Sequence, residues 1–157
     1  MTEIFINKAK ACAVTGHRVL ERDFSFEKLK NILERVVDAG FDTFLVGMAL
    51  GFDTQCFLAL HEIRKQKPIK IIACVPCESQ PIKFNEKQKK LYYDMLERAD
   101  HVVLVSKEYT NYCMMKRNRY MVDNCSLLFA YLKRNFGGTY HTVEYAKKQQ
   151  VQILNFD

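Results

Sequence analysis

Short apolar runs alternate with longer amphipathic segments along the chain. In the segment 24–39 the apolar positions recur every three or four residues, which predicts a helix with one buried face. Those positions are Leu29, Ile32, Leu33, Val36 and Val37. By contrast, Ile69–Val75 is almost continuously apolar, as is typical of a strand covered on both sides of a sheet.

The whole pattern predicts strands that alternate with helices. The expected strands are Ala11–Thr15, Thr43–Val46, Ile69–Val75, His101–Val105, Ser126–Leu132 and Val151–Leu154. The expected helices are Phe24–Ala39, Asp53–Gln66, Glu86–Ala99, Lys116–Asn124 and Thr139–Gln149. No Asn-Gly or Asp-Gly hairpin signal interrupts this alternation. We therefore expect an α/β protein, with a Rossmann-like, open and mainly parallel sheet of about six strands and helices on both faces.

Composition narrows the class of protein. With 157 residues, of which 48% are hydrophobic and 27% charged, the chain is long enough for one globular domain, which we expect to span 1–157. No apolar run approaches the ~20 residues that cross a bilayer, and the first residues lack signal-peptide features. We therefore expect a cytoplasmic protein with no membrane partner. The net charge of +6 favours a partner that carries phosphate.

The six cysteines are expected to be reduced, since nothing indicates secretion. They are Cys12, Cys56, Cys74, Cys77, Cys113 and Cys125. Cys74-Val-Pro-Cys77 has the spacing of a redox or metal motif, which is an alternative interpretation. A structural zinc site takes four ligands, and no second pair with matching spacing occurs, so we expect no metal.

Five of the six glycines lie in the segments just after predicted strands. They are Gly16, Gly47, Gly51, Gly137 and Gly138. In an open parallel sheet all of these positions lie at the carboxyl edge, where ligands bind. A glycine-rich turn before a helix also presents free N–H groups to phosphate, so Gly137-Gly138-Thr139, with Thr142 one turn later, is the strongest local signal.

Charged side chains accompany these glycines. Arg18 and Arg117 can each present a guanidinium fork to a phosphate or carboxylate. His17 either acts as an acid–base group or makes a structural hydrogen bond. Asp53 is favoured as the cap of the second helix, and contact with a ribose hydroxyl is its alternative role.

Four motifs together resemble the YpsA-like branch of the SLOG superfamily, which includes the LOG phosphoribohydrolases and the DNA-processing protein DprA. The motifs, in family order, are Thr15-Gly16-His17-Arg18, Gly47-x-x-x-Gly51-x-Asp53, Arg117-Asn118-Arg119-x-Met121-Val122-Asp123 and Gly137-Gly138-Thr139-x-x-Thr142-Val143-x-Tyr145-Ala146. The resemblance implies an open Rossmann-like sheet and a ligand such as NAD or ADP-ribose. By position it also implies that the pocket contains Gly16, Arg18, Gly47, Gly51, Asp53, Arg117, Asn118, Gly137, Gly138, Thr139 and Thr142.

The chain departs from the phosphoribohydrolase pattern Pro-Gly-Gly-x-Gly-Thr-x-x-Glu. Phe136 replaces the proline, and Tyr140 and His141 replace the Gly-Thr pair. Counted from the glycines, Glu144 falls on the glutamate position; counted from Thr142, that position holds Tyr145. The two registers place Glu144 on different sides of a helix, because one residue turns a side chain by about 100°.

Three functional hypotheses remain. The first is a protein that binds or senses a nucleotide derivative, with Arg18 and Arg117 supplying charge. The second is a nucleotide N-glycosidase, for which the candidate catalytic carboxylates are Glu144, Asp53 and Glu86. The third is a nucleic-acid-binding module, which the positive charge and the likeness to DprA suggest. Self-association of the chain is left open.

Overall fold

The computed structural model describes residues 4–157 and contains a fully parallel sheet. Its strands are β1 (Ala11–Gly16), β2 (Thr43–Val46), β3 (Lys70–Val75), β4 (His101–Leu104), β5 (Leu127–Tyr131) and β6 (Gln152–Asn155). Their spatial order is β4-β3-β2-β1-β5-β6, so β2 and β1 form the central pair and β5 pairs with the other edge of β1. The expected α/β class, strand number and parallel arrangement are confirmed.

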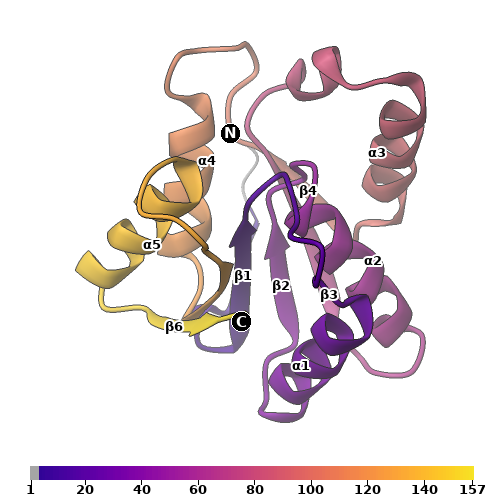
Figure 1. Ribbon diagram of the computed structural model, residues 1–157, viewed down its shortest axis with the longest axis vertical. Helices are drawn as coiled ribbons and strands as arrows, with labels where there is room; N and C mark the ends of the chain where they lie inside the picture. Colours follow the sequence, from indigo (N-terminus) through magenta and orange to yellow (C-terminus); the bar gives the residue numbers. More distant parts are fainter. Residues whose placement is uncertain (1–3) are drawn as a thin grey trace.

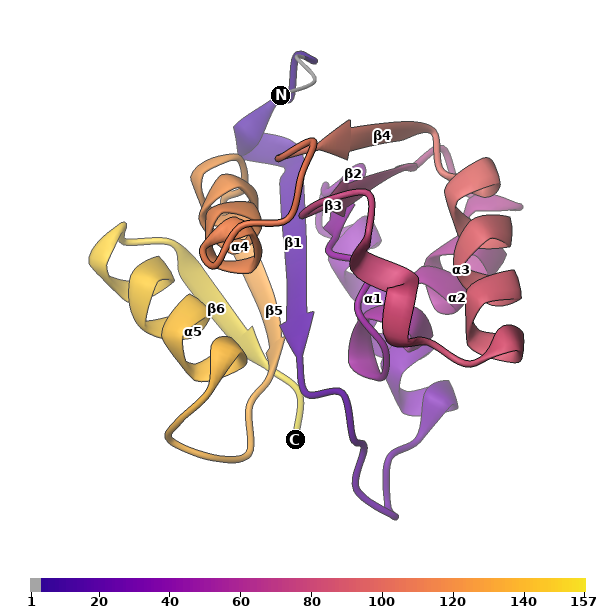
Figure 2. The same ribbon diagram turned by 90° about the horizontal axis from the view of Figure 1, so that it is seen from above.

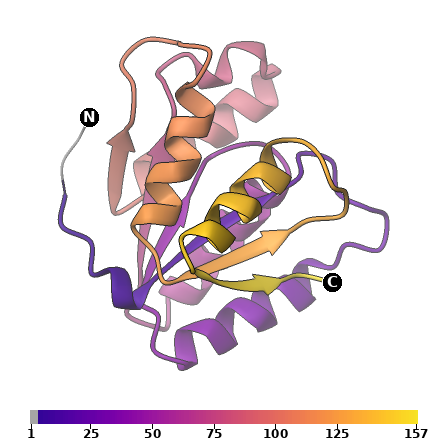
Figure 3. The ribbon, with the colours of Figure 1, turned by 90° about the vertical axis from the view of Figure 1, so that its left-hand side faces the viewer.

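Helices cover both faces of this sheet, as Figures 1 and 2 show. On one face lie α1 (Phe26–Asp38), α2 (Phe52–Arg64) and α3 (Glu86–Arg98); on the other lie α4 (Cys113–Asp123) and α5 (Gly138–Lys148). Two further single-turn 3-10 helices span Lys8–Lys10 and Gln80–Lys83. Figure 3 shows α4 and α5 side by side in front of β5 and β6.

Side-chain caps explain where two of these helices begin, α1 and α3. Ser25 accepts a hydrogen bond from the Lys28 N–H and so caps α1. Asn85 and Gln88 form a reciprocal capping box at the start of α3. The helices α2, α4 and α5 have no side-chain cap, and Gly51 occupies the N-cap position of α2. The prediction that Asp53 caps α2 is therefore wrong: Asp53 lies within the first turn.

An aromatic cluster fixes the start of α2 against the middle of the sheet. The Phe52 ring stacks on Tyr131 of β5, with ring centroids 5.4 Å apart and planes 12° apart, and meets the Phe129 ring edge-on. Phe24 and Phe156 complete the cluster. Because Phe52 is fully buried, burial of its ring provides about 1.5–3 kcal/mol to hold the chain just before Asp53 in place.

Membrane insertion is not indicated by the helices. Within residues 4–157, no helix combines the length and the apolar character needed to cross a bilayer.

Candidate ligand-binding cleft

A cleft of about 380 Å³ opens at the carboxyl ends of β1 and β5. The strand order reverses at this point: the chain leaves β1 toward β2 on one side and leaves β5 toward β6 on the other. Loops that diverge from two neighbouring strands leave a crevice between them, which is where open α/β sheets bind ligands. Residues far apart in the sequence, from Val14 to Thr139, line this cleft.

Arg117 of α4 forms the floor of the cleft and is 5% exposed. Its Nη1 donates to the Gly47 carbonyl and, at 3.4 Å, to the Cys74 carbonyl, while its Nε donates to Asn118 Oδ1 at 2.8 Å. Burial lowers the pKa of the guanidinium, and the charge of Asp53 opposes that change. The guanidinium thus ties α4 to the ends of β2 and β3, and these protein acceptors already engage it.

Asp53 carries the one buried side-chain oxygen or nitrogen within residues 4–157 that lacks a hydrogen-bond partner. Its Oδ2 accepts from the Ala49 N–H at 3.1 Å, whereas its Oδ1 has no donor. Burial raises the pKa of this carboxyl to about 6, although the Arg117 charge and the Ala49 N–H both act to lower it. Asp53 is among the residues that line the cleft, so a buried oxygen without a hydrogen-bond donor lies at its wall.

Two of the predicted glycines are required for contacts within the chain. A Cβ at Gly16 would lie 2.5 Å from the Phe52 side chain, and one at Gly51 would lie 2.2 Å from the Arg18 carbonyl oxygen. Gly51 also has a φ of +83°, which favours glycine. These residues allow the loop after β1 to pack on the start of α2, so their signal in the sequence reflects close packing of the chain.

The start of α5 provides the opposite wall of the cleft, through Gly138 and Thr139. The first N–H groups of a helix have no acceptor inside the helix and carry its positive dipole end. Gly137, with a φ of +93°, turns the chain into this helix. The Thr142 hydroxyl donates a hydrogen bond to the Gly138 carbonyl at 2.8 Å and so supports the first turn of α5.

Seven of the predicted site residues line the same cleft: Gly16, Arg18, Asp53, Arg117, Asn118, Gly138 and Thr139. The other four do not line it. Gly47 packs behind it against Arg117, Gly51 lines a separate groove, Gly137 precedes the wall, and Thr142 faces a groove between α4 and α5.

Other residues of the cleft were not predicted from the sequence. They include Arg134, Gln80 and Met114. Arg134 stands three residues before the first glycine of the Gly137-Gly138 pair, and this basic residue was the one available signal. Gln80 reaches the Gly47 carbonyl with its Nε2 at 3.4 Å, from a 3-10 turn that has no periodic pattern.

His17 has a structural hydrogen bond in this structure. Its ring is buried, and Nε2 accepts from the Lys133 N–H at 2.9 Å. Burial, followed by the charge of Arg134, lowers the pKa of this imidazole. The neutral ring joins the loop after β1 to the loop that leads into α5, and so connects the two walls of the cleft.

The other candidate carboxylates lie away from the cleft. Glu144 faces the groove between α4 and α5 and pairs with Lys147 at 3.5 Å. Glu86 is exposed at the start of α3. The structure therefore does not bring Glu144 and Asp53 to one site.

All six cysteines are buried, free thiols. Cys77 and Cys113 approach each other most directly, with their Sγ atoms 3.8 Å apart. Within residues 4–157, no three histidine, cysteine or acidic side chains gather as a metal site would require.

The parallel sheet and the cleft at its strand reversal define a Rossmann-like α/β protein. The chain belongs to the YpsA family, because the family model described as "YspA SLOG family" matches residues 12–156. The resemblance inferred from the four motifs is thus confirmed at the level of the family.

Relatives agree with this assignment. The chain is 31% identical over 118 residues to the protein named "Uncharacterized SPbeta prophage-derived protein YoqJ" of Bacillus subtilis, covering 67% of this chain and 69% of that protein. It is 27% identical over 121 residues to a UPF0398 protein of Halalkalibacterium halodurans, covering 74% of this chain and 64% of that protein.

Two solved structures of DNA processing protein A share the fold. The protein from Streptococcus pneumoniae superposes with a TM-score of 0.69 at 16% identity, covering 94% of this chain and 50% of that one. The protein from Helicobacter pylori, whose structure concerns single-stranded DNA binding, gives 0.68 at 14% identity, covering 95% of this chain and 66% of that one. The chain thus spans about half of the first of these structures and two thirds of the second.

Proposed function

We propose that the cleft binds a nucleotide derivative of the NAD or ADP-ribose kind. The observation that carries this proposal is the unpartnered Oδ1 of buried Asp53, which shares one cleft with cationic side chains and the start of α5. A ligand that satisfies both features needs an anionic group and a hydroxyl or amine donor. A nucleotide offers both, as phosphate and ribose.

The arginine side chains of the cleft differ in whether other groups of the protein already bind them. Arg117 is buried and engaged by backbone carbonyls. Arg18 and Arg134 are exposed, and neither forms an ion pair with another described residue. The Arg134 guanidinium lies 4.8 Å from the centroid of the Phe136 ring. Exposed guanidinium groups can form bidentate hydrogen bonds to phosphate without first breaking an ion pair. The phosphate therefore belongs near Arg18, Arg134 and the first turn of α5, with the ribose toward Asp53.

Calorimetric titration with NAD, ADP-ribose and AMP tests this proposal. We expect binding by the wild-type chain and at least about tenfold weaker binding by the Arg18→Gln variant, since a hydrogen bond to a charged group contributes about 1.5–3 kcal/mol. Arg22→Gln is the matched control, because Arg22 is exposed in the same loop and does not line the cleft. Absence of binding in a folded sample, or equal losses in both variants, contradicts the proposal.

A hydrolytic function is the second candidate, and the raised pKa of Asp53 favours it. A carboxyl that titrates near pH 6 is suited to proton transfer at physiological pH. Release of free base from nucleoside monophosphates, followed by chromatography, tests this function. Loss of release in Asp53→Asn but not in Glu144→Gln would support it, and no release by the wild-type protein would eliminate it for these substrates.

Binding of single-stranded DNA is the third candidate. It is favoured by the fold shared with the Helicobacter pylori protein and by the net charge of +6. Affinity measured by fluorescence anisotropy should then fall steeply with salt, because bound phosphates release counterions. No change in anisotropy at low salt would contradict this candidate.

A further inference from the structure

A second hollow, of about 420 Å³, lies beside the cleft, and we call it the α2–α3 groove. Its walls come from the loop after β2, from α2 and from α3. They are mainly apolar and include Met48, Leu50, Phe84, Leu91, Tyr92 and Met95. Sequence analysis assigned no function to these residues.

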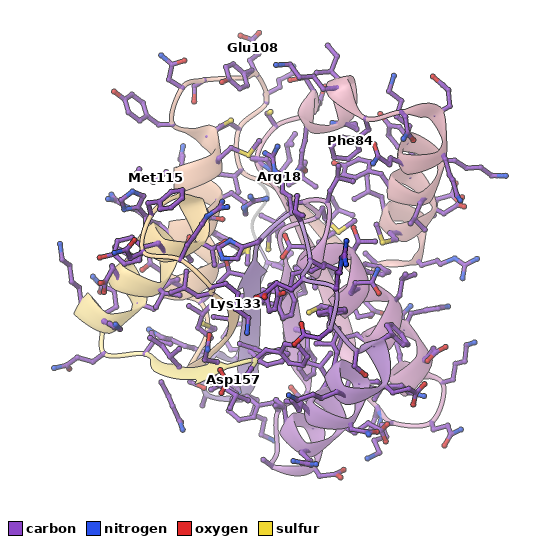
Figure 4. All side chains as sticks on the ribbon, viewed as in Figure 1. Arg18, Phe84, Glu108, Met115, Lys133 and Asp157 are labelled. Carbon is purple, nitrogen blue, oxygen red and sulfur yellow. The ribbon has the colours of Figure 1, made fainter. Side chains whose placement is uncertain are left out.

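One loop separates the groove from the cleft. Ala49 lines the cleft, whereas its neighbours Met48 and Leu50 line the groove. Arg18 and Val19 line both hollows, so the two meet at the loop after β1. Figure 4 shows Arg18 in the middle of the view, between Met115 of α4 and Phe84 before α3.

The dividing loop is firmly held. Arg117 and Gln80 both donate to the carbonyl of Gly47, at the start of the loop. Met48 is buried at 1% exposure and has a φ of +65°, a conformation that non-glycine residues rarely adopt. Such backbone strain persists only where the surroundings impose it, and it clusters at ligand sites.

The groove leaves apolar and amide groups without partners. Val19 is 83% exposed and Leu91 is 36% exposed, so both present apolar surface to water at its rim. Gln55 of α2 lines the groove, and its side-chain amide has no hydrogen-bond partner among the described residues. An apolar slot with an unengaged amide suits a flat heterocycle, because an amide can donate to and accept from its edge.

The groove on the other side of the cleft, between α4 and α5, has its aromatic and hydroxyl groups already engaged. The Arg119 guanidinium lies 5.1 Å from the Tyr145 ring centroid and covers that ring. The Tyr145 hydroxyl donates to Asp123 at 2.7 Å, and Thr142 donates to Gly138. A heterocycle would have to displace these contacts, so the α2–α3 groove is the better receptor.

We infer that the α2–α3 groove binds the base of the nucleotide whose phosphate occupies the cleft, an inference that rests on the proposed function. The ligand crosses the dividing loop at Arg18, with its ribose between the two hollows. The base packs against Leu91 and Val19 at the rim of the groove, and the Gln55 amide pairs with the base edge. A base with an adjacent donor and acceptor, such as adenine, matches this amide.

Two charge-matched variants test the position of the base. Leu91→Asp puts a carboxylate into the α2–α3 groove, and Met115→Asp puts one into the groove between α4 and α5. Both side chains are exposed on helices, at 36% and 45%, and both variants lower the net charge equally. Melting temperatures establish that each variant folds. Calorimetry then compares AMP, ribose 5-phosphate and pyrophosphate.

We expect Leu91→Asp to weaken AMP binding at least tenfold more than Met115→Asp, and both variants to bind pyrophosphate equally. In the wild-type chain, AMP should bind more tightly than ribose 5-phosphate, and Gln55→Leu should reduce that advantage. Equal losses of AMP affinity in the two variants, or a larger loss in Met115→Asp, would overturn the assignment. If AMP binds no tighter than ribose 5-phosphate, the base site is wrong while the phosphate site stands. If no phosphate compound binds, the proposed function itself fails.

Discussion

Replacing Asp53 with asparagine should change how the stability of the protein depends on pH. The variant removes a titrating charge from a buried position and keeps an oxygen that can accept from the Ala49 N–H. In the folded wild-type protein, burial raises the pKa of Asp53 from an ordinary value of 3.8 to about 6. The folded state therefore binds this proton more tightly than the unfolded state does.

The size of the effect follows from that difference in pKa. A difference of about two corresponds to about 3 kcal/mol, at about 1.4 kcal/mol for each pKa unit. The protonated carboxyl of Asp53 contributes this stability fully below the unfolded pKa of 3.8, and it is lost as the pH rises through about 6. Above that pH, the folded protein carries the cost of a buried charge that lacks one hydrogen-bond donor.

Other groups contribute little to the difference between the two proteins. Arg117 loses the opposing charge in the variant, but a guanidinium stays protonated throughout this pH range. The loss therefore adds an offset that does not vary with pH. His17 acts in the opposite direction, because its lowered pKa makes acid destabilising, but it is present in both proteins and cancels.

Urea denaturation of both proteins between about pH 4 and pH 8 measures this effect. We expect the free energy of unfolding of the wild-type protein, minus that of Asp53→Asn, to fall by roughly 2.5 kcal/mol across the range, with half of the change complete near pH 5, about midway between the unfolded and folded pKa values. A difference that stays constant with pH would refute the argument that desolvation raises the pKa of Asp53.

Three further measurements check the packing around the cleft. Gly51→Ala should destabilise the protein by at least about 1 kcal/mol more than Gly40→Ala. Both glycines have a positive φ, but only at Gly51 would a Cβ lie 2.2 Å from the Arg18 carbonyl oxygen. Equal losses of unfolding free energy in the two variants would contradict this reasoning. The six buried thiols should react with a thiol reagent only as the protein unfolds, and fast reaction of the native protein would exclude this burial. The His17 ring should titrate below pH 6.5 when followed by NMR, and the Lys133 amide hydrogen should be protected from exchange with solvent. An ordinary titration midpoint for His17, together with fast exchange of the Lys133 amide, would contradict the hydrogen bond between them.

The fold was predictable because its strands and helices carry strong periodic patterns. Apart from the exposed Lys70, Ile69–Val75 is buried in the sheet between α2 and α4. The convergence of Gly16, Asp53 and Gly138 at one edge follows from the parallel arrangement alone.

Details that depend on packing between loops were not predictable. In the sequence, Gly16 and Gly51 have the pattern of phosphate-binding glycines. The structure shows a different reason for them, because neighbouring residues of the chain occupy the space that a Cβ would need. Asp53 has the side chain of a helix cap, yet Gly51 takes the cap position and the carboxylate turns to Ala49. The path of the turn that carries Gln80 leaves no periodic trace in the sequence.

The strand reversal beside β1 has a consequence for protein synthesis. The strands β1 to β4 and their helices are complete once the ribosome has passed residue 104, but the edge of β1 that later pairs with β5 is still open. Arg117, Gly138 and Thr139 have not yet been made. The cleft is therefore not yet assembled during the early stages of folding, and the emerging half-sheet must keep its unpaired edge from other chains until translation supplies β5.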